Sequence, residues 1–291
     1  MITNPDKLFF PDDGFTKKDI ISYYFLMADY ILPYIKNRPF VMKRYPEGIE
    51  AEAFYQKEIP SYAPEWIKRV SIYHDDKSKT VNYPVITDTN SLLWLVNQGA
   101  LELHSWLSKV DKLENPDIMI IDLDPQPPAT FLDCLRVATL IRTALLELGL
   151  DAWPKTSGST GIHLFIPINT QYSFRETTLA AKNLFQVIQQ VYPQKVTLEH
   201  IIAKRTGKIY LDYLQNSRGR TMAFPYSIRP HIGAPVSTPL LWSEVEEGLI
   251  NPEGFNIKTI WRRVQELGDI MKGMFDKSYH IETLLNLSSK N

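Results

Sequence analysis

The chain has 291 residues, of which 44% are hydrophobic and 22% are charged, a composition typical of a globular protein. The formal net charge is −1, so binding to a polyanion must come from a local patch rather than from the whole molecule. A single cysteine excludes an internal disulfide and a cysteine-rich zinc site, and no apolar run reaches the ~20 residues of a membrane span. With no apolar signal segment at the N-terminus, these features predict a cytoplasmic globular protein.

The first sixty residues are predicted to contain a helix, a basic strand and an aromatic pair. Thr16 is the expected N-cap of a helix that ends near Pro33. A strand is expected over residues 40–45, and its basic residues either bind phosphate or form a solvated surface. Phe54 and Tyr55 are suited to base stacking, although an aromatic pair is more often part of a core.

A hairpin and a long helix are predicted next. Residues 70–74 and 80–86 alternate like paired strands around a polar turn. Residues 90–106 have the broad apolar face of a helix, with His104 near its C-terminal end. A lone histidine in that position is more often structural than a ligand.

Residues 117–125 place two carboxylates at the end of an apolar strand. Asp122 and Asp124 are two residues apart, so in a strand they point to the same face, roughly 6–7 Å apart at their Cα atoms. Two acids at that spacing can bind one Mg²⁺ or Mn²⁺. The alternative is a pair of exposed acids in a turn opened by Pro125.

The next segment predicts a β-α-β unit followed by a glycine-bearing loop. A helix over 130–148, closed by Gly149, is followed by a strand over 150–155. The polar loop at 155–161 carries two glycines and three hydroxyl side chains, before an alternating strand over 162–168. The loop suits a phosphate cradle or a simple hairpin turn, and it lacks the spacing of a Walker A motif.

The last third predicts a further buried acid within a basic region. After an amphipathic helix over 174–191, residues 208–214 form an expected strand with Asp212 in its middle. A carboxylate inside an apolar strand is costly to bury unless it is paired or binds a metal, so Asp212 is the natural third ligand. Residues 204–229 hold six bases against this one acid, the footprint of a polyanion site. The bases are Lys204, Arg205, Lys208, Arg218, Arg220 and Arg229. A final helix is expected over 257–275.

Together, these features predict nucleotidyl transfer. Three acids on two strands would hold two divalent ions, which can activate a 3′-hydroxyl and neutralise the departing pyrophosphate. The glycine loop and Arg229, at the end of a strand, would hold the triphosphate.

Four motifs, in the same order along the chain, carry a family resemblance: IDLDP at 121–125, TSGSTGIH at 156–163, DYLQN at 212–216 and PYSIR at 225–229. Nearly the whole chain resembles the polymerase domain of bacterial ligase D, a member of the archaeo-eukaryotic primase superfamily. The resemblance implies a mixed α/β fold of two facing sheets with flanking helices and the acids in the cleft between them. It implies a single domain over 1–291, with a DNA-end part at about 1–110 and a catalytic part at about 115–275.

The resemblance also implies an activity. The expected enzyme is a DNA-directed polymerase and primase that adds nucleotides, preferably ribonucleotides, at double-strand breaks in non-homologous end joining. Its cofactors would be Mn²⁺ or Mg²⁺, and its substrates NTPs or dNTPs and DNA ends or gapped duplexes with a 5′-phosphate. Ku and a DNA ligase are the expected partners, with a nucleoid-associated cytoplasmic location and no membrane contact. Two alternatives stay open: a primase-polymerase of replication, damage bypass or a mobile element, and a non-catalytic module that binds 5′-phosphorylated ends.

The resemblance further assigns roles to individual residues. The catalytic, metal-binding residues are Asp122, Asp124 and Asp212. The nucleotide-binding residues are His104, Ser157, Gly158, Thr160, His163, Arg205, Gln215 and Arg229. The DNA-binding residues are Asn4, Lys7 and Lys17 around the 5′-phosphate, and Lys43, Arg44, Phe54 and Tyr55 at the template, with Lys43 and Arg44 on a mobile loop. One position departs from the family pattern, because many relatives carry lysine in place of Thr160.

Overall fold

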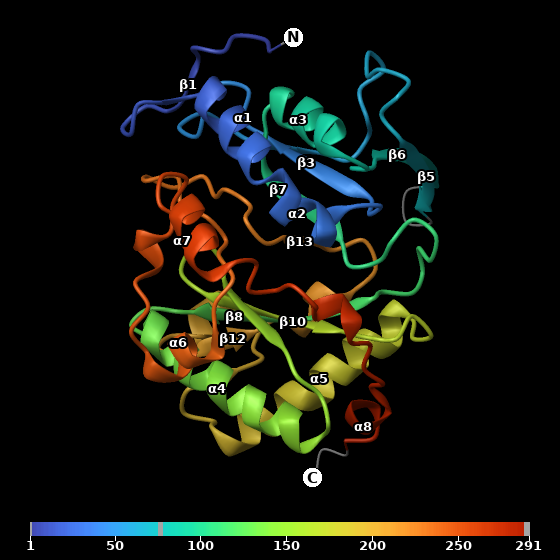
Figure 1. Ribbon diagram of the computed structural model, residues 1–291. Helices are drawn as coiled ribbons and strands as arrows, with labels where there is room; N and C mark the ends of the chain where they lie inside the picture. Colours follow the sequence, from blue (N-terminus) through green and yellow to red (C-terminus); the bar gives the residue numbers. More distant parts are fainter. Residues whose placement is uncertain (1, 75–77, 288–291) are drawn as a thin grey trace. The chain divides into compact units, whose positions relative to one another are not determined.

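The computed structural model describes residues 2–74 and 78–287. The chain divides into two compact units, each assembled from separate stretches of sequence. Unit 1 contains the chain up to Asp111 together with Thr221–Ser237 and Glu253–Gly268. Unit 2 contains Lys112–Arg220, Thr238–Pro252 and the chain from Asp269 onward. Each unit has its own sheet and helices, so the predicted mixed α/β class is confirmed (Figure 1).

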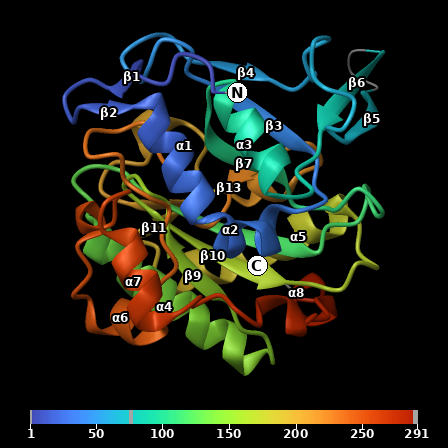
Figure 2. The same cartoon turned by 45° about the horizontal axis from the view of Figure 1, so that its top comes forward.

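Unit 1 is built on a four-stranded antiparallel sheet in the order β13-β7-β3-β4. Its strands are β13 (Thr221–Ala223), β7 (Ala100–Trp106), β3 (Phe40–Arg44) and β4 (Phe54–Gln56). Helix α3 (Thr89–Asn97) packs on β7 and against α1 (Lys17–Leu26), and Figure 2 shows these two helices side by side. The central strand β7 is therefore buried along its whole length.

The predicted first helix is two helices. Thr16 caps α1 as expected, in a capping box with Asp19. The helix ends at Leu26, and α2 (Ala28–Ile35) begins after Met27 with Pro33 inside it rather than at its end. Burial of the apolar residues of α2 offsets the backbone hydrogen bond that proline cannot make.

The predicted helix over 90–106 is wrong in its second half. The helix α3 ends at Asn97, Gly99 takes a left-handed conformation with φ of +87°, and the chain returns as strand β7. His104 therefore lies on a central strand and not at a helix end. An apolar run that is buried on both faces has no periodicity that separates a helix from a strand.

The smaller elements of unit 1 follow the predictions more closely. Strands β5 (Arg69–His74) and β6 (Lys79–Pro84) form the expected antiparallel hairpin, and residues 75–77 of its turn lie outside the described residues. Strands β1 (Leu8–Phe10) and β2 (Phe15–Thr16) form a second hairpin. Helix α7 (Ile260–Leu267) is shorter than the predicted 257–275.

Unit 2 is built on a five-stranded mixed sheet in the order β11-β12-β8-β10-β9. Its strands are β11 (Val196–Thr197), β12 (Ile209–Leu211), β8 (Ile118–Pro125), β10 (Ile162–Pro167) and β9 (Trp153–Thr156). Helices α4 (Phe131–Glu147) and α5 (Phe174–Val191) run along this sheet and both contact β8 (Figure 1). The acid-bearing strand β8 is thus the centre of the unit.

The helices of unit 2 begin and end near the predicted positions. Thr130 caps α4 in a capping box with Asp133, and Gly149 follows its C-terminus with φ of +75°. Ser173 caps α5 in the same way. Short helices α6 (Trp242–Glu247) and α8 (Glu282–Leu285) pack on α4 and α5, respectively. Within the described residues, no helix has the length and apolar character needed to span a bilayer.

Three strand predictions need correction. Strand β10 is buried throughout and does not alternate in exposure. Strand β12 ends at Leu211, so Asp212 follows the strand instead of lying in its middle. Asp212 caps the 3-10 helix η3 (Tyr213–Asn216), where its Oδ1 accepts a hydrogen bond from the Leu214 amide at 3.0 Å. The strand expected to end at Arg229 stops at Ala223, the last residue of β13.

Candidate functional site

Strand register in unit 2 aligns four polar residues, which we call the acid row: Lys155, His163, Asp122 and Asp212. Lys155 on β9 is the partner of His163 on β10, and His163 is the partner of Asp122 on β8. Leu211 pairs with Leu123, and the Asp212 amide then approaches the Asp122 carbonyl at 3.4 Å. Residues that are directly opposite in a sheet place their side chains on the same face. The register thus brings together residues from four segments of the chain.

The first three members of the acid row are in contact. The Lys155 Nζ lies 2.8 Å from His163 Nδ1, and His163 Nε2 lies 3.4 Å from Asp122 Oδ1. An ammonium group can only donate, so Nδ1 accepts and the ring proton is on Nε2, facing the carboxylate. Lys155 is fully buried and was not among the predicted site residues. The available signal was a lysine directly before the glycine loop, at the end of a strand.

The carboxylates create a negative potential around β8. Asp122 and Asp124 lie on the same face of β8, as their spacing predicted. Burial first, and then the charges of Asp124, Asp133 and Asp122, raise the pKa of the Cys134 thiol. Burial and the charge of Asp212 likewise raise the pKa of Tyr210. No three His, Cys, Asp or Glu side chains within the described residues form a ready-made metal site, which is consistent with Asp212 capping its own helix.

The glycine loop between β9 and β10 is a tight turn organised by Ser157. The Ser157 Oγ accepts hydrogen bonds from the Ser159 amide at 3.1 Å and from the Gly161 amide at 3.0 Å. Gly161 passes very close to β8, because an added Cβ would lie 2.2 Å from the Leu123 carbonyl oxygen. Gly158 has φ of +74°, and Thr160 is exposed at the tip. The loop is therefore a hairpin turn fixed against the acid-bearing strand.

Arg205 and Gln215 come before and after β12 in the sequence, and the Gln215 amide approaches the Asp212 carbonyl at 3.4 Å. Arg205 donates to the carbonyl oxygens of Glu199 at 2.7 Å and His200 at 2.6 Å, and its guanidinium stacks 3.5 Å from the centre of the Tyr210 ring. Gln215 lies in η3, half-buried, one turn after Asp212. Both side chains belong to unit 2, as do the three acids.

Unit 1 holds a second polar group, which we call the Glu102 cluster: Glu102, Lys43, Tyr45, His104 and Arg229. Glu102 is fully buried on β7. Its Oε1 lies 2.6 Å from Lys43 Nζ and accepts a hydrogen bond from Tyr45 Oη at 2.7 Å. Its Oε2 lies 2.8 Å from Arg229 Nε and 3.3 Å from His104 Nε2. One carboxylate thus connects four side chains, and three of them, Lys43, His104 and Arg229, were predicted site residues.

Charge keeps Glu102 ionised despite its burial. Burial alone would raise the pKa of this carboxyl, but the hydrogen bonds from His104 and Lys43 and the charge of Arg229 hold the pKa well below its usual range. Burial lowers the pKa of His104, so the ring is neutral near pH 7 and donates from Nε2. The cluster therefore contains two cations and one carboxylate.

The residues predicted at the template are not on a loop. Lys43 and Arg44 lie on β3, which pairs with both β4 and β7, so the mobile-loop assignment is wrong. Lys43 lies 5.6 Å from the centre of the Tyr55 ring, whereas Arg44 lies 5.5 Å from that of Phe54. Adjacent strand residues point to opposite faces, so Tyr55 accompanies the Glu102 cluster and Phe54 does not. The two rings do not form one shared platform.

The three residues predicted to grip a 5′-phosphate are together in unit 1. The Lys7 amide donates to the Asn4 carbonyl at 3.2 Å, and the Lys17 amide donates to the Lys7 carbonyl at 2.8 Å. Lys7 Nζ pairs with Glu47 at 2.6 Å, and Lys17 Nζ donates to Thr3 Oγ1 at 2.8 Å. Burial, followed by the charges of Lys7 and Arg44, lowers the pKa of Lys17. Positively charged side chains that lie this close together favour the binding of an anion.

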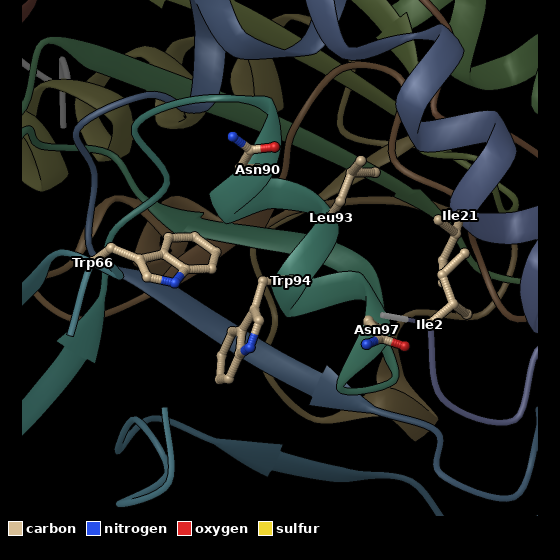
Figure 3. Close-up of a pocket in the computed structure, with 7 residues that line it drawn as sticks. All are labelled: Ile2, Ile21, Trp66, Asn90, Leu93, Trp94 and Asn97. Carbon is tan, nitrogen blue, oxygen red and sulfur yellow. The ribbon is translucent and has the colours of Figure 1, made fainter. Parts of the chain in front are cut away.

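A hollow of about 380 Å³ lies beside this group in unit 1 (Figure 3). Its lining residues are Ile2, Ile21, Trp66, Asn90, Leu93, Trp94 and Asn97. Asn97 connects it to the lysines, because its Oδ1 accepts hydrogen bonds from the Thr3 amide and hydroxyl. None of the predicted site residues lines this hollow.

The predicted site residues thus fall into two sets. Unit 2 carries the acids, the glycine loop, His163, Arg205 and Gln215, and unit 1 carries the Glu102 cluster and the residues predicted to bind DNA.

Comparison with known proteins shows which family the chain belongs to. The model of the LigD primase-polymerase domain matches residues 16–271.

The chain belongs to the LigD primase-polymerase domain family. It is 35% identical over 273 residues to the multifunctional non-homologous end joining protein LigD of Mycolicibacterium smegmatis, covering 93% of this chain and 35% of that protein. It is 36% identical over 267 residues to the bifunctional non-homologous end joining protein LigD of Bacillus subtilis, covering 91% of this chain and 42% of that protein. The chain therefore spans about two fifths or less of the curated relatives that it matches.

A solved structure agrees with the family. The polymerase domain of Mycobacterium tuberculosis Ligase D in complex with DNA has a TM-score of 0.88 and 30% sequence identity, covering 96% of this chain and 99% of that one. The resemblance carried by the four motifs is thereby confirmed, as is the expectation of a LigD-type primase-polymerase enzyme.

Proposed function

We propose that this LigD primase-polymerase domain adds nucleotides, with a preference for ribonucleotides, to primer 3′ ends at DNA double-strand breaks. The observation that carries the proposal is the acid row, which brings Asp122 and Asp212 to adjacent positions with Asp124 on the same strand face as Asp122. A protein that only binds DNA gains nothing from three carboxylates facing a polyanion. The acids therefore favour a catalytic role over a pure end-binding role.

The residues fit two Mn²⁺ or Mg²⁺ ions as cofactors. Asp122, Asp124 and Asp212 offer only oxygen ligands, which these hard cations prefer. The charges of Asp124 and Asp122, which add to the effect of burial in raising the pKa of the Cys134 thiol, also suit a cation. When bound, such ions lower the pKa of an attacking 3′-hydroxyl and neutralise the departing pyrophosphate. His163 orients the Asp122 carboxylate through Nε2, and the Leu214 amide orients that of Asp212.

The remaining predicted site residues would bind the nucleotide and the DNA. In this proposal the nucleotide-binding residues of unit 2 are Arg205, Gln215 and the loop that carries Ser157, Gly158 and Thr160, and those of unit 1 are His104 and Arg229. Asn4, Lys7 and Lys17 bind the 5′-phosphate at the far side of a gap. DNA as the substrate is supported by the solved neighbour, which is a complex with DNA. The relatives are named for non-homologous end joining, so we propose Ku and a DNA ligase as partners at the nucleoid.

Primer extension on a gapped duplex with a 5′-phosphate tests the proposal. We expect Asp122→Asn and Asp124→Asn to lower the extension rate at least about a hundredfold in Mn²⁺, because the metal would lose a charged ligand. Asp276→Asn, which changes an exposed acid of the same unit, is the matched control and should leave the rate unchanged.

The same assay compares NTPs with dNTPs. A lower KM for NTPs would support the ribonucleotide preference. Extension by Asp122→Asn at the wild-type rate would refute the metal assignment, and a wild-type protein that binds ends without extending them would refute the polymerase role.

A further inference from the structure

The Glu102 cluster joins three residues with different predicted roles. His104 and Arg229 were assigned to the nucleotide, and Lys43 was assigned to the template. The sheet places Glu102 between them, because Lys43 is its partner across β3 and β7 and His104 is two residues farther on the same face of β7. Arg229 reaches the same carboxylate from the segment after β13.

We propose that Glu102 is a positioning residue that holds Lys43, His104 and Arg229 as one nucleotide-binding group. The inference rests on the proposed function, because it concerns the nucleotide of that reaction. Glu102 touches no substrate in this proposal, and it acts through the three side chains that it orients.

The contacts of Glu102 show how its carboxylate fixes the orientation of the surrounding side chains. Both oxygens of Glu102 are occupied, one by Lys43 and Tyr45 and the other by Arg229 and His104. Lys43 and Arg229 expose only 22% and 19% of their side chains, so each presents little more than its tip. A long basic side chain otherwise samples many rotamers, and pairing with a buried partner removes that freedom before the nucleotide arrives.

Glu102 also fixes the tautomer of His104. A carboxylate oxygen can only accept, so His104 Nε2 carries the proton. The Nδ1 atom is buried and has no hydrogen-bond partner within the described residues, so a second proton there would be a buried donor without an acceptor. The neutral Nε2–H form is therefore the one that this environment accommodates.

Lys43 belongs to the Glu102 cluster, whereas the adjacent Arg44 does not. Lys43 pairs with Glu102, whereas the adjacent Arg44 donates to the Gln98 carbonyl at 2.7 Å and to Gln56 Oε1 at 2.8 Å. These neighbours point to opposite faces of β3, so Lys43 contacts Glu102 and Arg44 points away from it.

The test is a set of variants assayed for KM and kcat with ATP in primer extension, and for equilibrium binding of ATP. We expect Glu102→Gln and Lys43→Met to raise KM roughly tenfold to a hundredfold while kcat changes less, since charge-assisted contacts to the nucleotide would be lost. Arg69→Met, which changes a unit 1 strand arginine that donates to the Ala63 and Pro64 carbonyls, should leave the KM for ATP unchanged. Glu58→Gln, a half-buried carboxylate that contacts Asn82, is the control for removing an acid from unit 1.

A spectroscopic readout separates positioning from general destabilisation. Nitrogen NMR of the histidine rings should show the Nε2–H form of His104 in the wild type and a mixture of tautomers in Glu102→Gln, because a glutamine amide can also donate. An unchanged KM and an unchanged tautomer in a folded Glu102→Gln protein would overturn the proposal.

Two experimental outcomes call for a different measurement. Where Glu102→Gln does not fold, Tyr45→Phe and the double variant Lys43→Met/Glu102→Gln decide the matter, and wild-type ATP affinity in both would overturn the inference. Where the wild type extends no primer, the proposed function fails, and the His104 tautomer together with ATP binding still tests Glu102 on its own.

Discussion

Thr160 occupies an exposed position in the glycine loop, where the family resemblance leads us to expect lysine. The neighbouring residues of the loop are fixed, because Ser157 binds two of its amides and Gly161 contacts β8. A side chain at position 160 therefore starts from a rigid backbone and can change without disturbing the acids. At the scale of single residues, Thr160 is where the expected grip on a triphosphate is weakest.

We expect Thr160→Lys to lower the KM for ATP by about fivefold, because one more cation near the triphosphate contributes roughly 1 kcal/mol at an exposed site. Steady-state primer extension measures this, with Ser159→Lys as the neighbouring exposed control. Equal KM values for wild type and Thr160→Lys would show that the loop does not reach the triphosphate.

At the scale of elements, the site depends on how closely neighbouring strands approach. The turn between β9 and β10 comes so near β8 that only glycine fits at Gly161. This approach keeps His163 opposite Asp122 and Lys155 opposite His163. Backbone contact between these strands therefore determines the geometry of the acid row.

We expect Gly161→Ala to lower the free energy of unfolding by about 1–3 kcal/mol, because its Cβ would overlap the Leu123 carbonyl. Urea denaturation measures the change. Gly254→Ala is the control, since its Cβ would meet no atom within 4 Å. A Gly161→Ala protein as stable as the wild type would mean that the turn can move away from β8 without cost.

At the scale of the whole molecule, the net charge of −1 conceals separate charged regions in the two units. Unit 1 gathers Lys7 and Lys17, and the lowered pKa of Lys17 reflects burial and repulsion by neighbouring cations. A bound phosphate would relieve that repulsion. DNA binding should therefore depend on one patch and on salt, and not on the charge of the molecule as a whole.

We expect a 5′-phosphate to tighten binding to a gapped duplex about tenfold, and Lys17→Met to remove this advantage while Lys18→Met, an exposed neighbour, keeps it. Binding should also weaken as the pH rises, beginning below the ordinary lysine value of 10.5, because the lowered pKa of Lys17 deprotonates it earlier. Fluorescence anisotropy with phosphorylated and unphosphorylated gaps measures both effects. Equal affinity for the two gaps in the wild type would refute this pocket.

The sequence by itself determined the features that depend on neighbours along the chain. The helix caps at Thr16 and Thr130, the hairpin of β5 and β6, and the shared face of Asp122 and Asp124 follow from local hydrogen bonding and from the period of a strand. The four motifs were also sufficient for the family.

Only the tertiary structure decided the features that depend on distant partners. It made residues 100–106 a strand, because an apolar run buried on both faces carries no distinguishing period. It ended β12 before Asp212, and it brought Lys155 and Glu102 into the two polar groups. Strand register sets which residues face one another across a sheet, and that register results from pairing between segments far apart in the sequence.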